Sequence, residues 1–466
     1  MSERILRALM QLFAIIAKAE AGENKKGSEV VQSFLKEQLN LELVQQYLAL
    51  YEQYLDELHQ TAKRKDGGEK RLSLNSVKVL RICADINKEL AQKQKIVVLI
   101  RLIEFVNSEA GISEQEMEFI STVSESFNIE PEEFACIREF IESPEAKPKQ
   151  LSELLLIDSR RDPVGETIRH IYCEDLEGQL SILHVNSVNM YVFRYLGSAT
   201  MYLNGQVIKP FKVNVFNQGA SVRNPKIRPI YYSDVVGAFL SSESKSKIVF
   251  EASHIDFFFN KVKQGLHDIN IKEESGKLVG IMGGSGAGKS TLLKILNGLS
   301  VPTHGQVTIN GVNIHSGDET VEGQIGYIPQ DDLLIEDLSV FQNLFYSAKL
   351  SFGNLPDEEI TKRANEVLSD LGLFEARGLK VGSPLEQTIS GGQRKRLNIA
   401  LELIREPGIL FVDEPTSGLS SRDSENIMDL LKELTLKGKL VFVVIHQPSS
   451  DIFKMFDKLF IMDTGG

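Results

Sequence analysis

One short glycine-rich stretch constrains this chain more than any other. It reads Gly283-Gly284-Ser285-Gly286-Ala287-Gly288-Lys289-Ser290-Thr291 and matches the pattern G-x-x-x-x-G-K-[ST]. The apolar run 278–282 before it predicts a strand, and the pattern of residues 292–296 after it predicts a helix. A loop in this setting turns backbone N–H groups and the positive end of a helix dipole toward a polyphosphate. The context therefore favours a nucleotide phosphate site over a glycine-rich turn with a chance lysine.

The side chains around this loop suggest the chemistry. Lys289 is placed to reach the β and γ phosphates, and the Ser290 hydroxyl to bind magnesium. Further along, Asp413 ends the apolar run 409–413 and Glu414 follows it directly. A carboxylate at such a strand end can hold magnesium, and its neighbour can orient or deprotonate an attacking water.

Three further motifs accompany the loop and the carboxylate pair, in an order that is hard to obtain by chance. They are Tyr327-Ile328-Pro329-Gln330, then Ser390-Gly391-Gly392-Gln393 before a helical run, and finally Ile445-His446-Gln447-Pro448 after an apolar run. This set resembles the ATP-binding cassette (ABC) family, with its Walker A loop, Q-loop, signature, Walker B strand and H-loop. The resemblance implies ATP and Mg²⁺ as ligands, with magnesium held by Ser290, Gln330 and Asp413. It also implies catalytic roles for Glu414, His446 and Gln330. A lone histidine is more often structural, but the run 445–450 after an apolar strand matches the H-loop and favours the functional role.

The resemblance also implies a second copy of the nucleotide-binding domain. Ser390, Gly391, Gly392 and Gln393 would bind the γ-phosphate held by the partner in a head-to-tail dimer. The D-loop of the family reads Ser-Gly-Leu-Asp, whereas this chain has Ser420 after Ser417-Gly418-Leu419. The exchange concerns communication between the two sites and leaves the catalytic set complete.

An aromatic residue is expected to stack on adenine in this family. Phe259, or less favourably Phe257, stands at that place in the sequence. A strand aromatic that faces the core is an equally good interpretation of either residue.

Several longer segments narrow the resemblance to the white/ABCG-type transporters. They are residues 330–334, 338–350 and 446–453. In that group the ATPase precedes a membrane domain in one polypeptide. Because the chain stops after the strand-like run 459–463, we expect a fragment whose transmembrane permease half would follow, and expect the fragment itself to be soluble at the cytoplasmic face of the membrane.

The fold class expected is multidomain, with an all-α domain, a small β domain and an α/β P-loop NTPase with an α-helical subdomain. Residues 1–142 carry a helical pattern, 143–165 read as a proline-containing linker, 166–245 alternate with period two, and 246–466 hold the ABC motifs. The β domain is predicted to be a sandwich or barrel with an Asn204-Gly205 hairpin turn. It faintly resembles a forkhead-associated sandwich but lacks the phosphothreonine-binding pattern.

The helical domain resembles the TerB family because an acidic turn occurs twice in it. Glu-Ala-Gly occurs at residues 20–22 and again at residues 109–111, where TerB proteins have Asp-Gly. The family pattern would nominate Glu20, Glu109 and Glu116 as metal ligands. A glycine that ends a helix near acidic residues is the simpler interpretation and is favoured here.

Composition excludes several other classes. The net charge of −12 disfavours a nucleic-acid partner, and no run of about 18 apolar residues is present. The three cysteines lack metal-ligand spacing and read as reduced thiols. Residues 4–21 have a leader-like outline, but Gln11 and Lys18 interrupt it and favour a buried amphipathic helix.

Two rival functions stay open at this point. One is a soluble cassette ATPase that acts on nucleic acid or ribosomes; the acidic balance and the single cassette count against it. The other is a regulatory module that binds ATP without useful turnover, a possibility raised by Ser420 and the two added domains.

Overall fold

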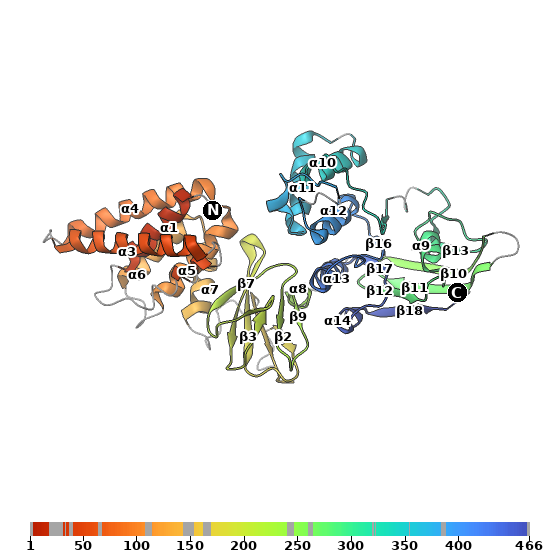
Figure 1. The fold of residues 1–466 in the computed structure, drawn as a ribbon, viewed down its shortest axis with the longest axis horizontal. Helices are drawn as coiled ribbons and strands as arrows, with labels where there is room; N and C mark the ends of the chain where they lie inside the picture. The colour runs from red at the N-terminus through yellow and green to blue at the C-terminus, as the bar shows by residue number, and fades with distance from the viewer. Residues whose placement is uncertain are drawn as a thin grey trace. The chain divides into compact units, whose positions relative to one another are not determined.

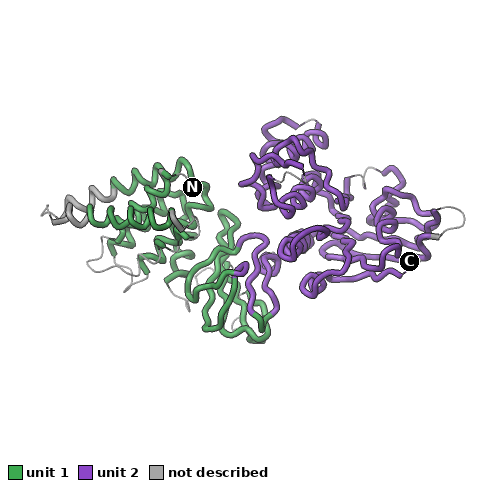
Figure 2. The backbone as a smooth tube through the Cα atoms, viewed as in Figure 1, with its two compact units in different colours: residues 1–202, 206–216, 225–227 green, residues 203–205, 217–224, 228–466 purple. Residues whose placement is uncertain are grey.

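A computed structural model describes most of the chain. The described residues are 3–17, 31–32, 34–36, 41–63, 68–107, 114–142, 153–161, 169–239, 247–259, 264–318, 321, 323–353, 355–383 and 388–463. They divide into two compact units (Figure 2). Unit 1 holds residues 1–202, 206–216 and 225–227, and unit 2 holds 203–205, 217–224 and 228–466. This division differs from the predicted domain boundary at 245/246, because parts of the β region cluster with the motif-bearing half.

Unit 1 begins with amphipathic helices, as the sequence predicts for residues 1–142. The helices are α1 (Glu3–Ala17), α3 (Leu41–Lys63), α4 (Gly68–Glu89), α5 (Gln92–Val106), α6 (Glu114–Ser126) and α7 (Pro131–Glu142) (Figure 1). Their apolar faces form one core, to which α1 contributes Leu9 and Phe13, both fully buried. The buried amphipathic helix expected near the N-terminus is therefore confirmed.

A five-stranded sheet completes unit 1, in the order β2-β1-β3-β4-β7. Its strands are β1 (Leu154–Asp158), β2 (Arg169–Tyr172), β3 (Gln179–Val185), β4 (Met190–Leu196) and β7 (Val213–Phe216). The linker prediction for 143–165 is wrong over β1, where Leu155 is fully buried and pairs with Ile182 of β3. The neighbouring prolines suggested a linker, but the short apolar run has enough buried side chains to join a sheet.

A second sheet has the strand order β6-β5-β8-β9. It comprises β5 (Tyr202–Leu203), β6 (Gln206–Val207), β8 (Ser221–Arg223) and β9 (Ile230–Tyr231). Asn204 and Gly205 have φ values of 52° and 85°, as a type I′ hairpin turn requires. Helix α8 (Tyr232–Phe239) follows β9, in a region that the sequence predicts to be β only.

Two larger sheets of unit 2 share one core. The antiparallel sheet has the order β11-β10-β13-β14, and the parallel sheet has the order β15-β16-β17-β12-β18. Phe411 and Phe442 of the parallel sheet stack with ring centroids 4.9 Å apart, and Phe250 of the antiparallel sheet packs against both. The strands are β10 (Val249–Phe258), β11 (Gln264–Glu274), β12 (Leu278–Gly283), β13 (His304–Ile309), β14 (Val312–Asn313), β15 (Ile325–Ile328), β16 (Ile409–Asp413), β17 (Leu440–Val444) and β18 (Lys458–Met462).

Unit 2 also contains helices after α8. They are α9 (Lys289–Leu296), α10 (Val340–Ser351), α11 (Asp357–Asp370), α12 (Gly391–Leu403), α13 (Ser421–Leu436) and α14 (Ser450–Phe453). Helices α10, α11 and α12 pack on one another and form the predicted helical subdomain (Figure 1). Among the described residues, no helix combines the length and the hydropathy that a membrane crossing requires.

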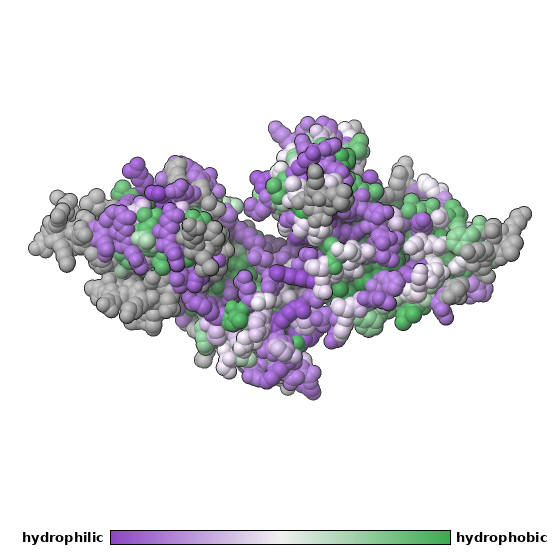
Figure 3. All heavy atoms as spheres, in the orientation of Figure 1, coloured by the Kyte–Doolittle hydropathy of each residue, from purple (hydrophilic) through white to green (hydrophobic). Residues whose placement is uncertain are grey.

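The visible face of both units is mostly polar, with apolar side chains in scattered patches (Figure 3). All three cysteines are buried thiols outside any disulfide bond. Burial raises the pKa of the Cys83 thiol to about 11, so the thiol stays protonated at neutral pH.

Candidate nucleotide-binding site

The glycine-rich loop lies between β12, which ends at Gly283, and α9, which begins at Lys289. Gly286 and Gly288 have φ values of 83° and 95°, a region that residues with a side chain rarely adopt. At Gly288 a Cβ atom would also lie 3.1 Å from a methyl carbon of Leu266. At Gly284 and Gly286 the same test finds open space. The loop thus packs closely on one side and leaves its other side free for a ligand.

Lys289 is the cation at the centre of the loop. Its side chain is largely buried, and Nζ donates hydrogen bonds of 2.9 Å to the carbonyl oxygens of both Gly283 and Gly284. Ser290 follows in the first turn of α9 and is exposed. An ammonium group over an open backbone loop is a fitting cradle for the terminal phosphates of a nucleotide.

The predicted motifs meet at the carboxyl edge of the parallel sheet. Strand β17 lies between β16, which ends at Asp413, and β12, which leads into the loop. Asp413 pairs in register with Val444, the last residue of β17, and His446 follows two residues later. This edge is where α/β sheets bind their ligands.

Asp413 is a buried carboxylate with one anionic and three cationic neighbours. Its burial and the adjacent charge of Glu414 raise the pKa of Asp413, while Lys294, Lys395 and Lys289 act in the opposite direction. The lysine charges do not fully offset the burial. A carboxylate at this strand end, beside the exposed Ser290 hydroxyl of the loop helix and the Gln330 side chain, offers the oxygen ligands that magnesium prefers, so the residues present fit the expected ion.

The structure brings together Gln330 and Glu414, two of the residues that the sequence nominates for the site. The amide Nε2 of Gln330 donates to Oε2 of Glu414 over 3.1 Å. Glu414 adopts a φ of 43°, and its backbone N–H donates to the carbonyl of Val444 over 3.0 Å. A positive φ is uncommon for a residue with a side chain, and such backbone conformations occur often at functional sites.

Helix α12 holds the segment after Gln330 in place, a contact that the motifs alone do not predict. Lys395 donates to the carbonyl oxygen of Gln330 over 2.8 Å, and Arg394 pairs with Asp332 at 3.3 Å. Asn398 accepts a hydrogen bond from the backbone of Leu333 over 3.3 Å. Basic side chains that are buried in a helix need such partners. The run 394–396 next to a signature motif was the available signal.

Ser390 begins α12 as its N-cap. Its hydroxyl accepts from the backbone N–H of Gln393 over 3.2 Å, and the Gln393 side chain accepts from the Ser390 backbone over 2.9 Å. Within the described ranges, no hydrogen bond joins Ser390 or His446 to the glycine-rich loop, and both side chains are exposed. These two motifs are therefore open to a further molecule.

Ser420 has a local structural role. Ser420 is the N-cap of helix α13, because its hydroxyl accepts from the backbone N–H of Asp423 over 3.1 Å. The same hydroxyl donates to the Asp423 carboxylate over 2.7 Å. Serine is among the best residues for this position, so the exchange from aspartate keeps the helix start intact.

Phe259 is the more exposed of the two candidate aromatic residues. It is 57% exposed, whereas Phe257 packs into the core of the sheets. The two rings meet edge to face at 5.4 Å. A Cβ atom on Gly265 would lie 2.6 Å from the Phe259 ring, and the carbonyl of Gly265 faces Gly288 of the loop. Phe259 thus lies near the loop, where an adenine platform is expected.

The predicted metal site of the helical domain remains a prediction. Glu20 and Glu109 lie outside the described residues, and Glu116 is buried in α6. No cluster of three or more potential ligands occurs among the residues that the structure describes.

Two family profiles match the chain. Residues 266–417 match the ABC transporter family, and residues 6–139 match the family of tellurite resistance protein TerB. The chain is 42% identical over 192 residues to "ABC-type transporter claG" of Penicillium crustosum, which covers 41% of the chain and 26% of that protein. It is 39% identical over 206 residues to the "Broad substrate specificity ATP-binding cassette transporter ABCG2" of Rattus norvegicus, covering 44% and 31%.

Among solved structures, cbiO1 from Clostridium perfringens, part of the ABC transporter complex cbiONQ, is 27% identical with a TM-score of 0.42. The alignment covers 46% of this chain and 85% of that one. The chain spans about a quarter to a third of the length of the curated relatives named above. The chain thus contains an ABC transporter nucleotide-binding domain, homologous to those of ABCG transporters, behind an N-terminal TerB domain.

Proposed function

We propose that this chain binds MgATP and hydrolyses it to drive transport through a membrane permease. The observation that carries the proposal is the meeting of Gln330 with Glu414 at the sheet edge that also holds Asp413 and the glycine-rich loop. Lys289 and the loop backbone would hold the phosphates, with Phe259 beside the adenine. Ser290, Asp413 and Gln330 would hold Mg²⁺, which neutralises charge on the transferring phosphoryl group.

Glu414 would act on the attacking water in this proposal. Its carboxylate is fixed by Gln330 at 3.1 Å, so it can orient the water and accept its proton. His446 would contact the γ-phosphate from the next strand. These roles follow the ABC transporter homology of residues 266–417.

A head-to-tail dimer would complete the site. Ser390 is exposed, and Gly391 and Gly392 begin α12. The helix dipole favours an anion at this end. The γ-phosphate held by a second copy would bind there. The membrane partner is proposed from the ABCG homology, and it would place the chain at the cytoplasmic face of a membrane.

The test is MgATP hydrolysis by the parent chain beside Glu414→Gln. The amide keeps the size of the side chain but cannot take a proton, so we expect a drop in kcat of about a hundredfold or more. ATP should remain bound, and the mass in solution should shift to that of a dimer with ATP. Equal turnover in the two proteins would refute the role of Glu414, and a parent without turnover would favour the regulatory alternative.

A further inference from the structure

Helix α13 is covered along one face by a segment that comes from the β region of the sequence. The segment comprises residues 217–224 and 228–239, which cluster with α13 in unit 2. The residues of α13 that meet it recur at helical spacing, at positions 425, 426, 429, 433 and 436. The opposite face of α13 packs into the core of the unit.

Specific contacts run along this face. The Gln218 side chain donates to Glu433 over 2.9 Å, and the backbone N–H of Ser233 donates to the buried carboxylate of Asp429 over 3.2 Å. Gly237 approaches α13 so closely that a Cβ atom there would lie 3.1 Å from Leu436. The segment is therefore fitted to α13.

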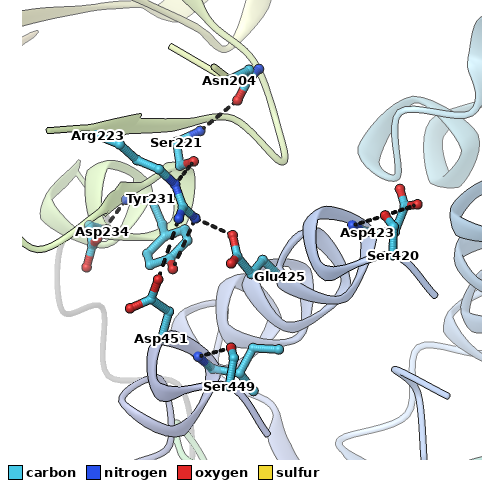
Figure 4. A network of polar contacts seen from close by, with 11 residues as sticks. Asn204, Ser221, Arg223, Tyr231, Asp234, Ser420, Asp423, Glu425, Ser449 and Asp451 are labelled. Carbon is cyan, nitrogen blue, oxygen red and sulfur yellow. Dashed lines mark hydrogen bonds and ion pairs between the residues drawn. The ribbon is translucent and has the colours of Figure 1, made fainter. Parts of the chain in front are cut away.

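One guanidinium joins α13 to α14 (Figure 4). Arg223, at the end of β8, forms an ion pair with Glu425 of α13 and contacts Asp451 of α14 at 3.5 Å. Its Nε donates to the Ser221 hydroxyl over 2.9 Å, and the guanidinium lies 5.7 Å from the ring centre of Tyr231. The two neighbours fix the rotamer of Arg223, so the two carboxylates meet a preformed fork.

The two helices begin directly after two site motifs. Helix α13 is capped by Ser420, the last residue of the D-loop, and α14 is capped by Ser449, three residues after His446. Figure 4 shows both caps on the helices that Arg223 joins. Without Arg223, Glu425 and Asp451 would face each other as two like charges, which favours separation of the helices.

We propose that Arg223 is a positioning residue for ATP hydrolysis, which holds the helix after the D-loop and the helix after the H-loop at a fixed separation. It does so from outside the region that matches the ABC transporter profile. By fixing α14, it sets the place of His446 at the sheet edge. The inference rests on the proposed function, because it assigns Arg223 an effect on that reaction.

The test compares kcat and KM for MgATP in the parent, Arg223→Ala, Arg223→Lys and Asp451→Asn. Arg223→Ala should lower kcat about tenfold with KM within about twofold, because misplacement of a catalytic group acts on the reacting state. Arg223→Lys should recover part of kcat, since it keeps the charge but loses the fork. Asp451→Asn should lower kcat about threefold, because it cuts the link to α14 and leaves the contacts with α13.

Arg228→Ala is the matched control, since Arg228 lies in the same segment and is exposed. It should leave kcat unchanged. A kcat of Arg223→Ala and Asp451→Asn equal to that of the parent would overturn the inference. If Arg223→Ala folds poorly, Asp451→Asn alone decides, because it removes one partly exposed contact.

Hydrogen exchange separates failure of the inference from failure of the proposed function. Amides in residues 446–453 should exchange several-fold faster in Arg223→Ala than in Arg228→Ala. A parent without turnover would refute the proposed function. In that case, unchanged exchange in Arg223→Ala would overturn the joining of the two helices as well, and faster exchange would support it.

Discussion

Each unit has a join, a set of polar contacts that connects a helix to a strand, and the two joins differ in their charges. In unit 1, Arg101 and Glu104 of α5 form a buried pair at 2.6 Å, and both bond the backbone of Val213 in β7, at 2.8 and 2.7 Å. In unit 2, Arg223 faces Glu425 and Asp451, with the buried Asp429 nearby on the same helix face. The first join balances its charges, whereas the second has more carboxylates than cations.

The surroundings of the two joins differ as well. The helices and the five-stranded sheet of unit 1 share one apolar core, which includes Leu183, Val192 and Val213 beside the helical residues. Arg194 adds a hydrogen bond of 3.0 Å to the carbonyl of Ile141, and burial lowers its pKa to about 10. A buried join with paired charges should keep its strength over a wide range of pH. A join with surplus carboxylates changes strength with proton concentration.

Among tests of this contrast, Arg101→Ala should have the largest effect on stability. It leaves the buried Glu104 without its directly paired cation, and we expect a loss of about 3 kcal/mol of stability in unit 1. Hydrogen exchange in α5 and thermal unfolding would measure the loss. Arg138→Ala, which removes a more exposed pair at 3.6 Å, is the control and should cost well under about 1 kcal/mol. A small effect in both variants would mean that apolar packing alone holds unit 1 together.

The next test uses pH on the join in unit 2. Burial raises the pKa of Asp429 to about 7, and Asp234 and Glu433 add to the shift. The docked state therefore binds more protons than the undocked state between about pH 4 and 7, so docking weakens as the pH rises through that window. The loss should approach about 1 kcal/mol per pH unit.

Exchange of the α8 amides, corrected for the intrinsic pH effect, would measure this loss between pH 5.5 and 7.5. Asp429→Asn keeps an acceptor for the Ser233 N–H and cannot ionise, so its docking should be flat with pH. An unchanged slope in that variant would assign the titration to another group, with Asp234, whose pKa burial also raises, as the first candidate.

The smallest expected effect is that of Gln218→Ala. It removes a neutral donor that bonds Glu433 at 2.9 Å, and Glu433 keeps its pair with Lys437 at 2.8 Å. We expect a loss of about 1 kcal/mol or less, seen as a modest rise in α8 exchange. A loss as large as that of Arg101→Ala would show that the two joins are equally dependent on single polar contacts.

The sequence could predict those parts of the site that are local. A few consecutive residues define each of three features: the loop 283–291, the strand end at Asp413 and the segment with His446 after β17. Parallel pairing of the strands brings the three together. The contacts made by Arg223 could not be predicted in this way. Arg223 and Glu425 are 202 positions apart, and an arginine in a short strand is ordinary until the fold places it.

The same distinction between local and long-range features applies to the fold. Long helical patterns in residues 1–142 and the alternating apolar runs of the sheets were predicted. Strand β1 and helix α8 were missed, because each is short and depends on partners elsewhere in the chain: β3 for the first and α13 for the second.

The hydrogen bonds between α12 and the segment after Gln330 couple the signature segment to Glu414. Ser390 stands at one end of this helix, and Lys395, less than two turns on, holds the carbonyl of the residue whose amide touches Glu414. Helix α12 and two hydrogen bonds thus connect the signature segment to the Glu414 carboxylate. A shift of α12 by about 1 Å would stretch the 2.8 Å bond between Lys395 and Gln330 beyond hydrogen-bonding range. A molecule that docks at Ser390 and moves α12 would therefore change the position of Glu414 without moving the sheet.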